Sequence, residues 1–249
     1  MLDHNSKIRF YHVPKSGGTT IFNMTQNWKN FKRAHPRKNH VAISYYPPGI
    51  GEIGLAVIRH PYSRFISAFY HMVDSCNSNF YYRNAKQSDC ETLKSMGVSD
   101  FGNLYNNDPN IFLEALDNKQ NQLHYITKEI FNNFDIFKPQ FYWLSDIFSL
   151  KIHPGIKIIL NQESLESEFN TIAQQIGQVP TWSQRINSRL SQNEIPLSDH
   201  SKNILNKIYK QDFQHFTFKT LSMDSFGNNS FGNNSFGTNN IHSYNSMFY

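Results

Sequence analysis

The chain has 249 residues, of which 39% are hydrophobic, with a formal net charge of +5 and two cysteines. The length and hydrophobic content predict one domain of ordinary size with a substantial core, and exclude a chain that cannot fold by burial. The positive charge favours acidic ligands. Because the sequence has no regular Lys/Arg stripe and no known nucleic-acid module, we expect no nucleic acid partner.

The cysteines and the N-terminal residues bear on the cellular compartment. Cys76 and Cys90 are too few for a zinc site or a disulfide framework. They could pair in an oxidising compartment, but nothing marks the chain as secreted, so we expect two reduced thiols. No signal-peptide core is present, and no run reaches the ~18 apolar residues of a membrane span. The sequence therefore predicts a soluble, cytoplasmic protein.

A strand predicted over residues 7–13 leads through a glycine-bearing turn into a helix predicted over residues 19–29. Unpaired backbone N–H groups at the start of such a helix point at one place, which favours an anion. The turn also carries a lysine and several hydroxyl groups, so it predicts a phosphate or sulfate site, unless the two glycines form only a tight turn. The candidate ligands are Lys15, Ser16, Gly17, Gly18, Thr19 and Thr20.

Basic residues follow from Lys29 to His40, and residues 41–45 are predicted to form a strand. A basic run of this kind is either a solvated face or a grip on an acidic acceptor. The sequence leaves both interpretations open.

The second informative stretch runs from residue 54 to residue 70. Residues 55–58 form an apolar run typical of a central parallel strand, and Pro61 suits the first turn of a helix. Arg59 follows the strand, and Ser67 lies about two turns into the helix. Ligands of open α/β sheets bind at the carboxyl ends of the strands, so both side chains could reach one phosphate there.

The rest of the chain alternates between polar stretches and regular elements. Residues 74–108 are predicted to form a polar insertion, and residues 139–144 are assigned to packing alone. Further elements are predicted as a strand over residues 156–160 and helices over residues 108–116, 162–177 and 198–216.

The C-terminal residues 221–249 differ in composition from the domain predicted over residues 1–220. The unit Ser225-Phe-Gly-Asn-Asn229 recurs at residues 230–234 and, in altered form, at residues 235–239. A polar repeat with one aromatic residue per unit buries too little surface to offset its ordering entropy. We expect a low-complexity, disordered tail.

Two motifs together resemble one enzyme family. The order Pro14-Lys-Ser-Gly-Gly-Thr-Thr20, with lysine before the glycines, differs from the Walker A order and resembles the 5′-phosphosulfate loop of sulfotransferases. The pattern from Arg59 to Ser67 resembles the 3′-phosphate motif of the same superfamily, although His60 stands where the family commonly has aspartate. The donor of that superfamily is 3′-phosphoadenosine 5′-phosphosulfate (PAPS).

The resemblance is closest to carbohydrate sulfotransferases of the heparan sulfate 2-O and chondroitin/dermatan type. It implies a P-loop-like three-layer sandwich, α/β in class, with a central parallel sheet flanked by helices. Asn39-His-Val-Ala-Ile43 resembles the element that carries the catalytic base of those enzymes, which implies that His40, or else the nearby His35, is the base and Lys15 the other catalytic group.

The resemblance further implies in-line transfer without a metal to an acceptor hydroxyl, on a glycan or a small molecule. The absence of a Golgi anchor fits a bacterial or viral setting better than an animal one. Two alternatives remain: a nucleotide or small-molecule kinase on the same core, and a non-catalytic nucleotide-binding protein. The absence of a G-K-[ST] sequence argues against the kinase interpretation.

Overall fold

The structure is a computed structural model that describes residues 2–75, 83–180, 182 and 195–218. The chain divides into a compact unit, Met1–Lys219, and a second unit, Thr220–Tyr249. The second unit, which holds the repeats expected to be disordered, lies outside the described residues. All described helices and strands belong to the first unit.

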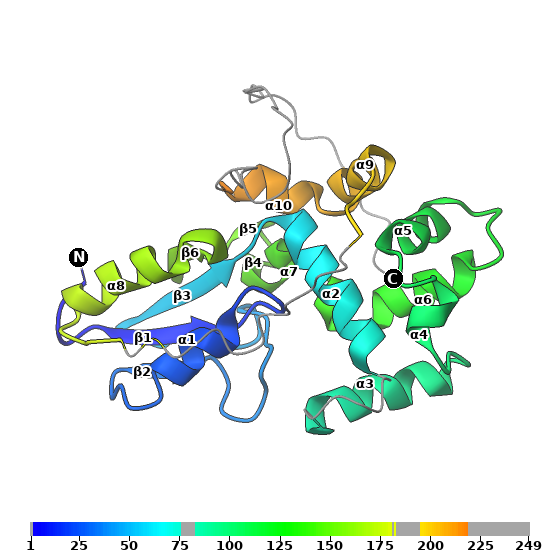
Figure 1. Cartoon of the computed structure of the whole chain (residues 1–249). Coiled ribbons are helices and arrows are strands. Elements are labelled where there is room, and N and C mark those ends of the chain that lie inside the picture. Colours follow the sequence, from blue (N-terminus) through cyan, green and yellow to red (C-terminus); the bar gives the residue numbers. More distant parts are fainter. Residues whose placement is uncertain (1, 76–82, 181, 183–194, 219–249) are drawn as a thin grey trace. The chain divides into compact units, whose positions relative to one another are not determined.

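A four-stranded parallel sheet forms the centre of this unit (Figure 1). Its strands, in the spatial order β2-β1-β3-β6, are Phe31–Arg33, Lys7–Tyr11, Glu52–Ile58 and Ile156–Asn161. With helices on its flanks, the sheet confirms the predicted α/β class with a central parallel sheet. The loop with Lys15 follows β1, and the segment with Arg59 follows β3. Because these two strands are neighbours, the topology brings the two motifs together.

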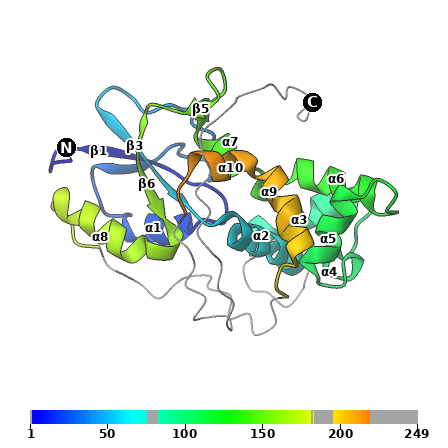
Figure 2. The same ribbon diagram turned by 90° about the horizontal axis from the view of Figure 1, so that it is seen from above.

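Each face of the sheet has its own apolar cover (Figure 2). One face packs on α1 (Gly18–Met24) and α8 (Leu165–Gln175, after a 3-10 turn at Gln162–Ser164). The other face packs on α7 (Gln140–Leu144), which leads into the short antiparallel pair β4 (Ser145–Asp146) and β5 (Lys151–Ile152). Side chains alternate along each strand, so neighbours such as Leu55 and Ala56 enter opposite cores.

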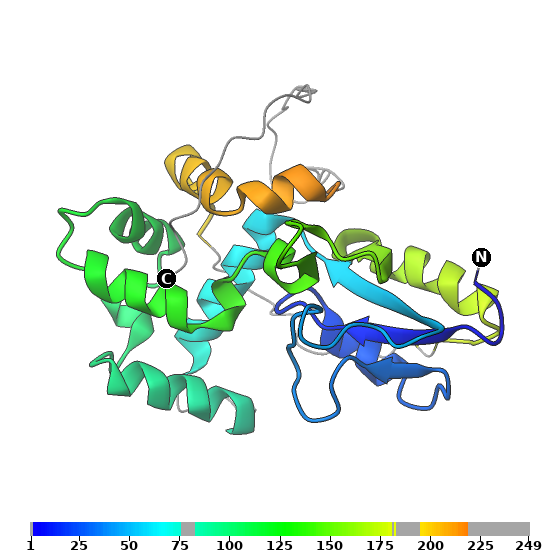
Figure 3. The same ribbon diagram turned by 180° about the vertical axis from the view of Figure 1, so that it is seen from behind.

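Further helices gather around α2, Pro61–Ser75, beyond the sheet (Figures 1 and 3), and they share a third apolar cluster. Aromatic side chains fill much of it, with Phe112 in ring contact with Phe65, Phe69 and Tyr105. The remaining helices are α3 (Arg83–Ser95), α4 (Phe101–Leu104), α5 (Pro109–Asp117), α6 (His124–Asn133), a 3-10 turn (Asp135–Phe137), α9 (Asp199–Ile208) and α10 (Lys210–His215).

The strand predicted over residues 41–45 is wrong. Ile43 donates one backbone hydrogen bond to the carbonyl of Trp143 (2.9 Å), and two turns follow, closed by bonds from Tyr45 to Ala42 and from Tyr46 to Ile43. The apolar residues of this segment pack on α7 instead of pairing in the sheet. The fourth strand is β2, which lies within the basic run.

The polar stretch after α2 is more regular than predicted, because it contains α3 and α4. Its apolar residues from Leu93 to Tyr105 belong to the helical cluster, but a turn at residues 96–97 divides them between two helices, so no single period runs through the stretch. The expectation of two reduced thiols is also corrected, because Cys90 is disulfide-bonded. The chain's other cysteine, Cys76, lies outside the described residues.

Candidate active site

The loop after β1 has an unusual backbone. Lys15 and Gly17 both have positive φ, at 64° and 86°, a conformation that costs a lysine about 1–2 kcal/mol and a glycine little. Gly18 has no room for a side chain, because a Cβ there would lie 2.0 Å from the His12 ring. Among the described residues, none accepts a hydrogen bond from the backbone N–H groups of Gly17, Gly18 and Thr19. Unpaired backbone donors of this kind are typical of loops that bind an anion.

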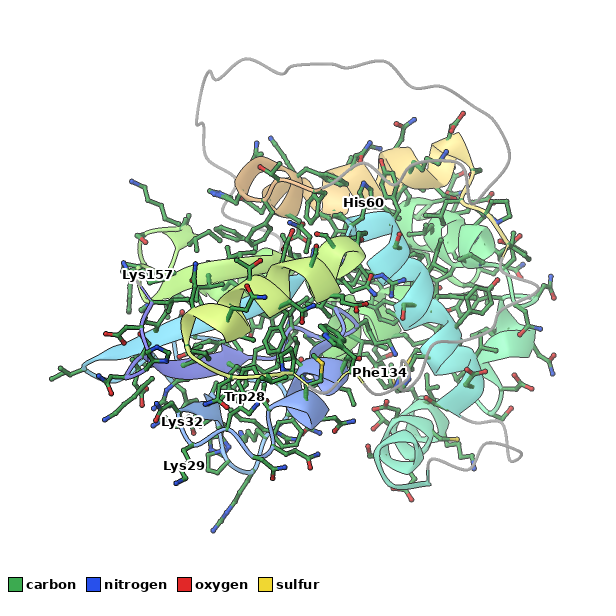
Figure 4. The ribbon with its side chains drawn as sticks, turned by 60° about the vertical axis from the view of Figure 1, so that its left-hand side comes forward. Trp28, Lys29, Lys32, His60, Phe134 and Lys157 are labelled. Atoms are coloured by element: carbon green, nitrogen blue, oxygen red, sulfur yellow. The ribbon has the colours of Figure 1, made fainter. Side chains whose placement is uncertain are left out.

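Arg59 lies against this loop. It follows β3 directly, and its Nη1 donates to the carbonyl oxygen of Lys15 at 3.5 Å. Ser67 lies half-buried on the seventh position of α2. The next residue after the arginine, His60, marks this end of the sheet in Figure 4, and Lys29 and Lys32 lie far from it in the same view.

Two neighbouring residues of the basic run, both on β2, make different contacts. Lys32 forms an ion pair with Glu52, which begins β3 at the end opposite Arg59. Arg33, the next residue, stacks on the Phe22 ring of α1, with its guanidinium carbon 3.2 Å from the ring centroid. Each of these two basic side chains is thus engaged within the domain, Lys32 by a carboxylate and Arg33 by an aromatic ring.

Gln140 connects the two motifs, although the sequence analysis assigned its segment to packing alone. Its fully buried amide oxygen accepts from Ser16 Oγ (3.1 Å) and from the backbone N–H of Arg59 (2.8 Å). Its amide nitrogen donates to the carbonyl of Arg59 (2.8 Å). The Ser16 hydroxyl, predicted to be a ligand donor, thus donates to another side chain.

Arg64 is a second residue next to the loop that the sequence analysis did not single out. Its fully buried guanidinium donates to the carbonyls of Ile136 (2.9 Å), Lys138 (2.6 Å) and, over a longer 3.5 Å, Pro14. In the sequence, Arg64 is the second arginine of the segment that resembles the 3′-phosphate motif. Nothing in that pattern shows that its side chain points into the core. It ties the loop to α2 and to the segment before α7.

His40 lies beside the loop. Its Nδ1 is 3.0 Å from the carbonyl oxygen of His12, and the two rings are 4.4 Å apart. Since a carbonyl can only accept, Nδ1 carries the proton of the neutral ring and Nε2 is left as an acceptor. Burial lowers the pKa of His40, and the charges of Lys15 and His71 lower it further, against the opposing effects of the His12 hydrogen bond and Asp135.

His35 has the opposite arrangement. Its Nδ1 accepts from the backbone N–H groups of Arg37 (3.1 Å) and Lys38 (3.0 Å), so the proton of its neutral ring is on Nε2. A neutral His35 in this geometry has no lone pair left with which to take a proton. His12 also stays neutral, because burial and the neighbouring charges lower its pKa to about 3.

Comparison with known proteins decides the family. The family model described as "Sulfotransferase family" matches residues 1–219. The chain belongs to the sulfotransferase family. This family is part of the PAPS-dependent superfamily, which includes carbohydrate sulfotransferases, and it implies PAPS as sulfate donor and a hydroxyl acceptor. No curated protein and no solved structure matches the chain.

The sulfotransferase has no helix, within the residues that the structure describes, with the length and apolar character needed to cross a bilayer.

Proposed function

We propose that this sulfotransferase moves the sulfuryl group of PAPS in line to a hydroxyl group of a carbohydrate, with Lys15 and His40 as its catalytic groups. The observation that carries the proposal is the contact of Arg59 with the backbone of Lys15, because it joins the two segments that resemble the phosphate motifs of the superfamily. The donor has a phosphate at each end of its ribose, and two cationic anchors suit it.

The donor would be held by the loop at its 5′ end and by α2 at its 3′ end. The free backbone donors of residues 17–19, with Lys15 and Thr20, face the 5′-phosphosulfate, and Arg59 and Ser67 bind the 3′-phosphate. Sulfuryl transfer, like phosphoryl transfer, depends on positioning and on stabilisation of charge. Lys15 neutralises the charge that grows on the leaving phosphate oxygen.

His40 rather than His35 is proposed as the base. The tautomer fixed by the His12 carbonyl leaves Nε2 of His40 free to accept a proton from the acceptor hydroxyl. The lowered pKa keeps the ring neutral near pH 7, which a base requires. The carbohydrate acceptor is supported by the likeness of residues 39–43 to the base element of carbohydrate sulfotransferases.

Nucleotide binding tests the proposed donor. Isothermal titration of 3′-phosphoadenosine 5′-phosphate, ADP and ATP should show tight binding of the 3′-phosphorylated nucleotide alone. Arg59→Ala should weaken that binding by about 10-fold or more, because a charged hydrogen-bond donor to the 3′-phosphate is lost. Equal or tighter binding of ATP by the wild type would reject the sulfotransferase donor and favour a kinase.

The pH dependence of kcat/KM tests the base. A base acts in its unprotonated form, so activity should be full above the pKa of His40 and fall as the pH drops through it. Because burial lowers that pKa, the midpoint of the acid limb should lie below the ordinary value of 6.5. His40→Ala should remove this limb and leave slow, pH-independent transfer.

The matched control is His35→Ala, which should leave the midpoint in place. The assignment of His40 as the base would be rejected if His40→Ala still had an acid limb with the wild-type midpoint. It would also be rejected if His35→Ala shifted the midpoint.

A further inference from the structure

The amide of Gln140 makes a hydrogen bond at each of its four positions. In addition to the three bonds with Ser16 and Arg59, its second amide hydrogen points to Asp212 Oδ2, at 3.4 Å from the nitrogen. An amide with two acceptor and two donor positions is thereby saturated by groups from three separate parts of the chain. No other natural side chain of this length supplies two donors and a two-fold acceptor in one plane.

Asp212 also contacts the backbone on either side of the Gln140 side chain's attachment, at the start of α7. The carboxylate, on α10, accepts from the backbone N–H groups of Gln140 (3.0 Å) and Phe141 (2.8 Å), which are the first two of α7. Both Gln140 and Asp212 are fully buried, so water does not compete for their hydrogen bonds. The carboxylate fixes the start of α7, and the start of α7 fixes where the amide can reach.

Gln140 contacts each motif through a group other than those proposed to bind phosphate. In the loop it holds the Ser16 hydroxyl, and at the end of β3 it grips both the N–H and the carbonyl of Arg59. It is placed to set the distance between the two motifs and takes no part in binding. A ligand with two phosphates binds more tightly in such a site. Its second phosphate binds strongly only when the loop and Arg59 are already at the right distance from each other.

We propose that Gln140, oriented by Asp212, is a positioning residue that sets the loop of residues 14–18 and Arg59 at the separation a bisphosphorylated nucleotide requires. The inference rests on the proposed function. It adds that the selectivity for two phosphates depends on a side chain that touches neither of them.

The test compares ligands with one and two phosphate groups on the Gln140→Met chain, which keeps the side-chain length and removes all four hydrogen bonds. Titration of 3′-phosphoadenosine 5′-phosphate should show a Kd raised by about 10-fold or more. Adenosine 5′-phosphate and adenosine 3′-phosphate each use one anchor, so their Kd values should change by less than about threefold. The selective loss distinguishes positioning from general damage, which would weaken all three nucleotides alike.

Two further variants complete the design. Gln120→Met makes the same change at an exposed residue and should leave all three Kd values unchanged. Asp212→Asn, nearly identical in shape, should reproduce the selective loss if Gln140→Met does not fold. Equal weakening of all three nucleotides in a folded variant, or no weakening of any, would overturn the inference. Failure of the proposed function would instead be seen in the wild type, as equal or tighter binding of ATP.

Discussion

Replacing Lys15 by alanine is expected to lower kcat by about 10²–10³-fold at saturating PAPS, the usual effect of removing a group that stabilises charge in a transition state. The fold should tolerate the change. Alanine and lysine have similar difficulty with the left-handed backbone at this position, so the free energy of unfolding should stay within about 1 kcal/mol of wild type. The measurement is the transfer of labelled sulfate to a polysaccharide acceptor, with thermal unfolding followed in parallel.

The control for this experiment is Lys128→Ala, which makes the same substitution at an exposed residue of α6. It should have wild-type kcat. A Lys15→Ala enzyme with kcat within about threefold of wild type would show that the lysine takes no part in the chemical step.

Replacing Arg64 by leucine should reduce the free energy of unfolding by about 3–5 kcal/mol. The substitution leaves the partly buried carbonyls of Ile136 and Lys138 without their donors, and each such loss costs about 1–3 kcal/mol. It also removes the positive charge that opposes the rise in the pKa of Asp212 caused by burial. Urea unfolding of the wild type and the variant gives the difference directly.

Arg37→Leu is the matched control, because Arg37 is exposed, and its stability should change by less than about 0.5 kcal/mol. Arg64→Lys keeps the charge but cannot reach several carbonyls with one planar group, so it should lie between wild type and Arg64→Leu. A loss below about 1 kcal/mol in Arg64→Leu would mean that the three carbonyls find other donors.

Much of the sheet could be predicted because its strands are short apolar runs beside turn residues. Residues 55–58 and 156–160 lie in β3 and β6 as predicted. The segment over residues 41–45 has the same composition, but its apolar side chains are buried against α7, and burial by a helix and burial in a sheet leave the same pattern in a sequence. The three-residue β2 is too short to show any pattern.

The candidate site could be predicted only in part for a related reason. Lys15 and Arg59 are found from local motifs, because each follows a strand and precedes a helix. Gln140 acts on residues 124 and 81 positions away in the chain, and such distances carry no local signal. The choice between His40 and His35 depends on which ring nitrogen meets a backbone group, which only the folded chain determines.

The contacts of Gln140 and Asp212 have a consequence for how the protein is made. The loop and Arg59 lie within the first 60 residues, whereas the amide between them is residue 140 and the carboxylate that holds the amide is residue 212. A nascent chain leaves the ribosome N-terminus first at roughly 5–20 residues per second, so both motifs emerge seconds before the residues that join them. A chain that terminates before α10 keeps both motifs and lacks the contacts that fix their separation.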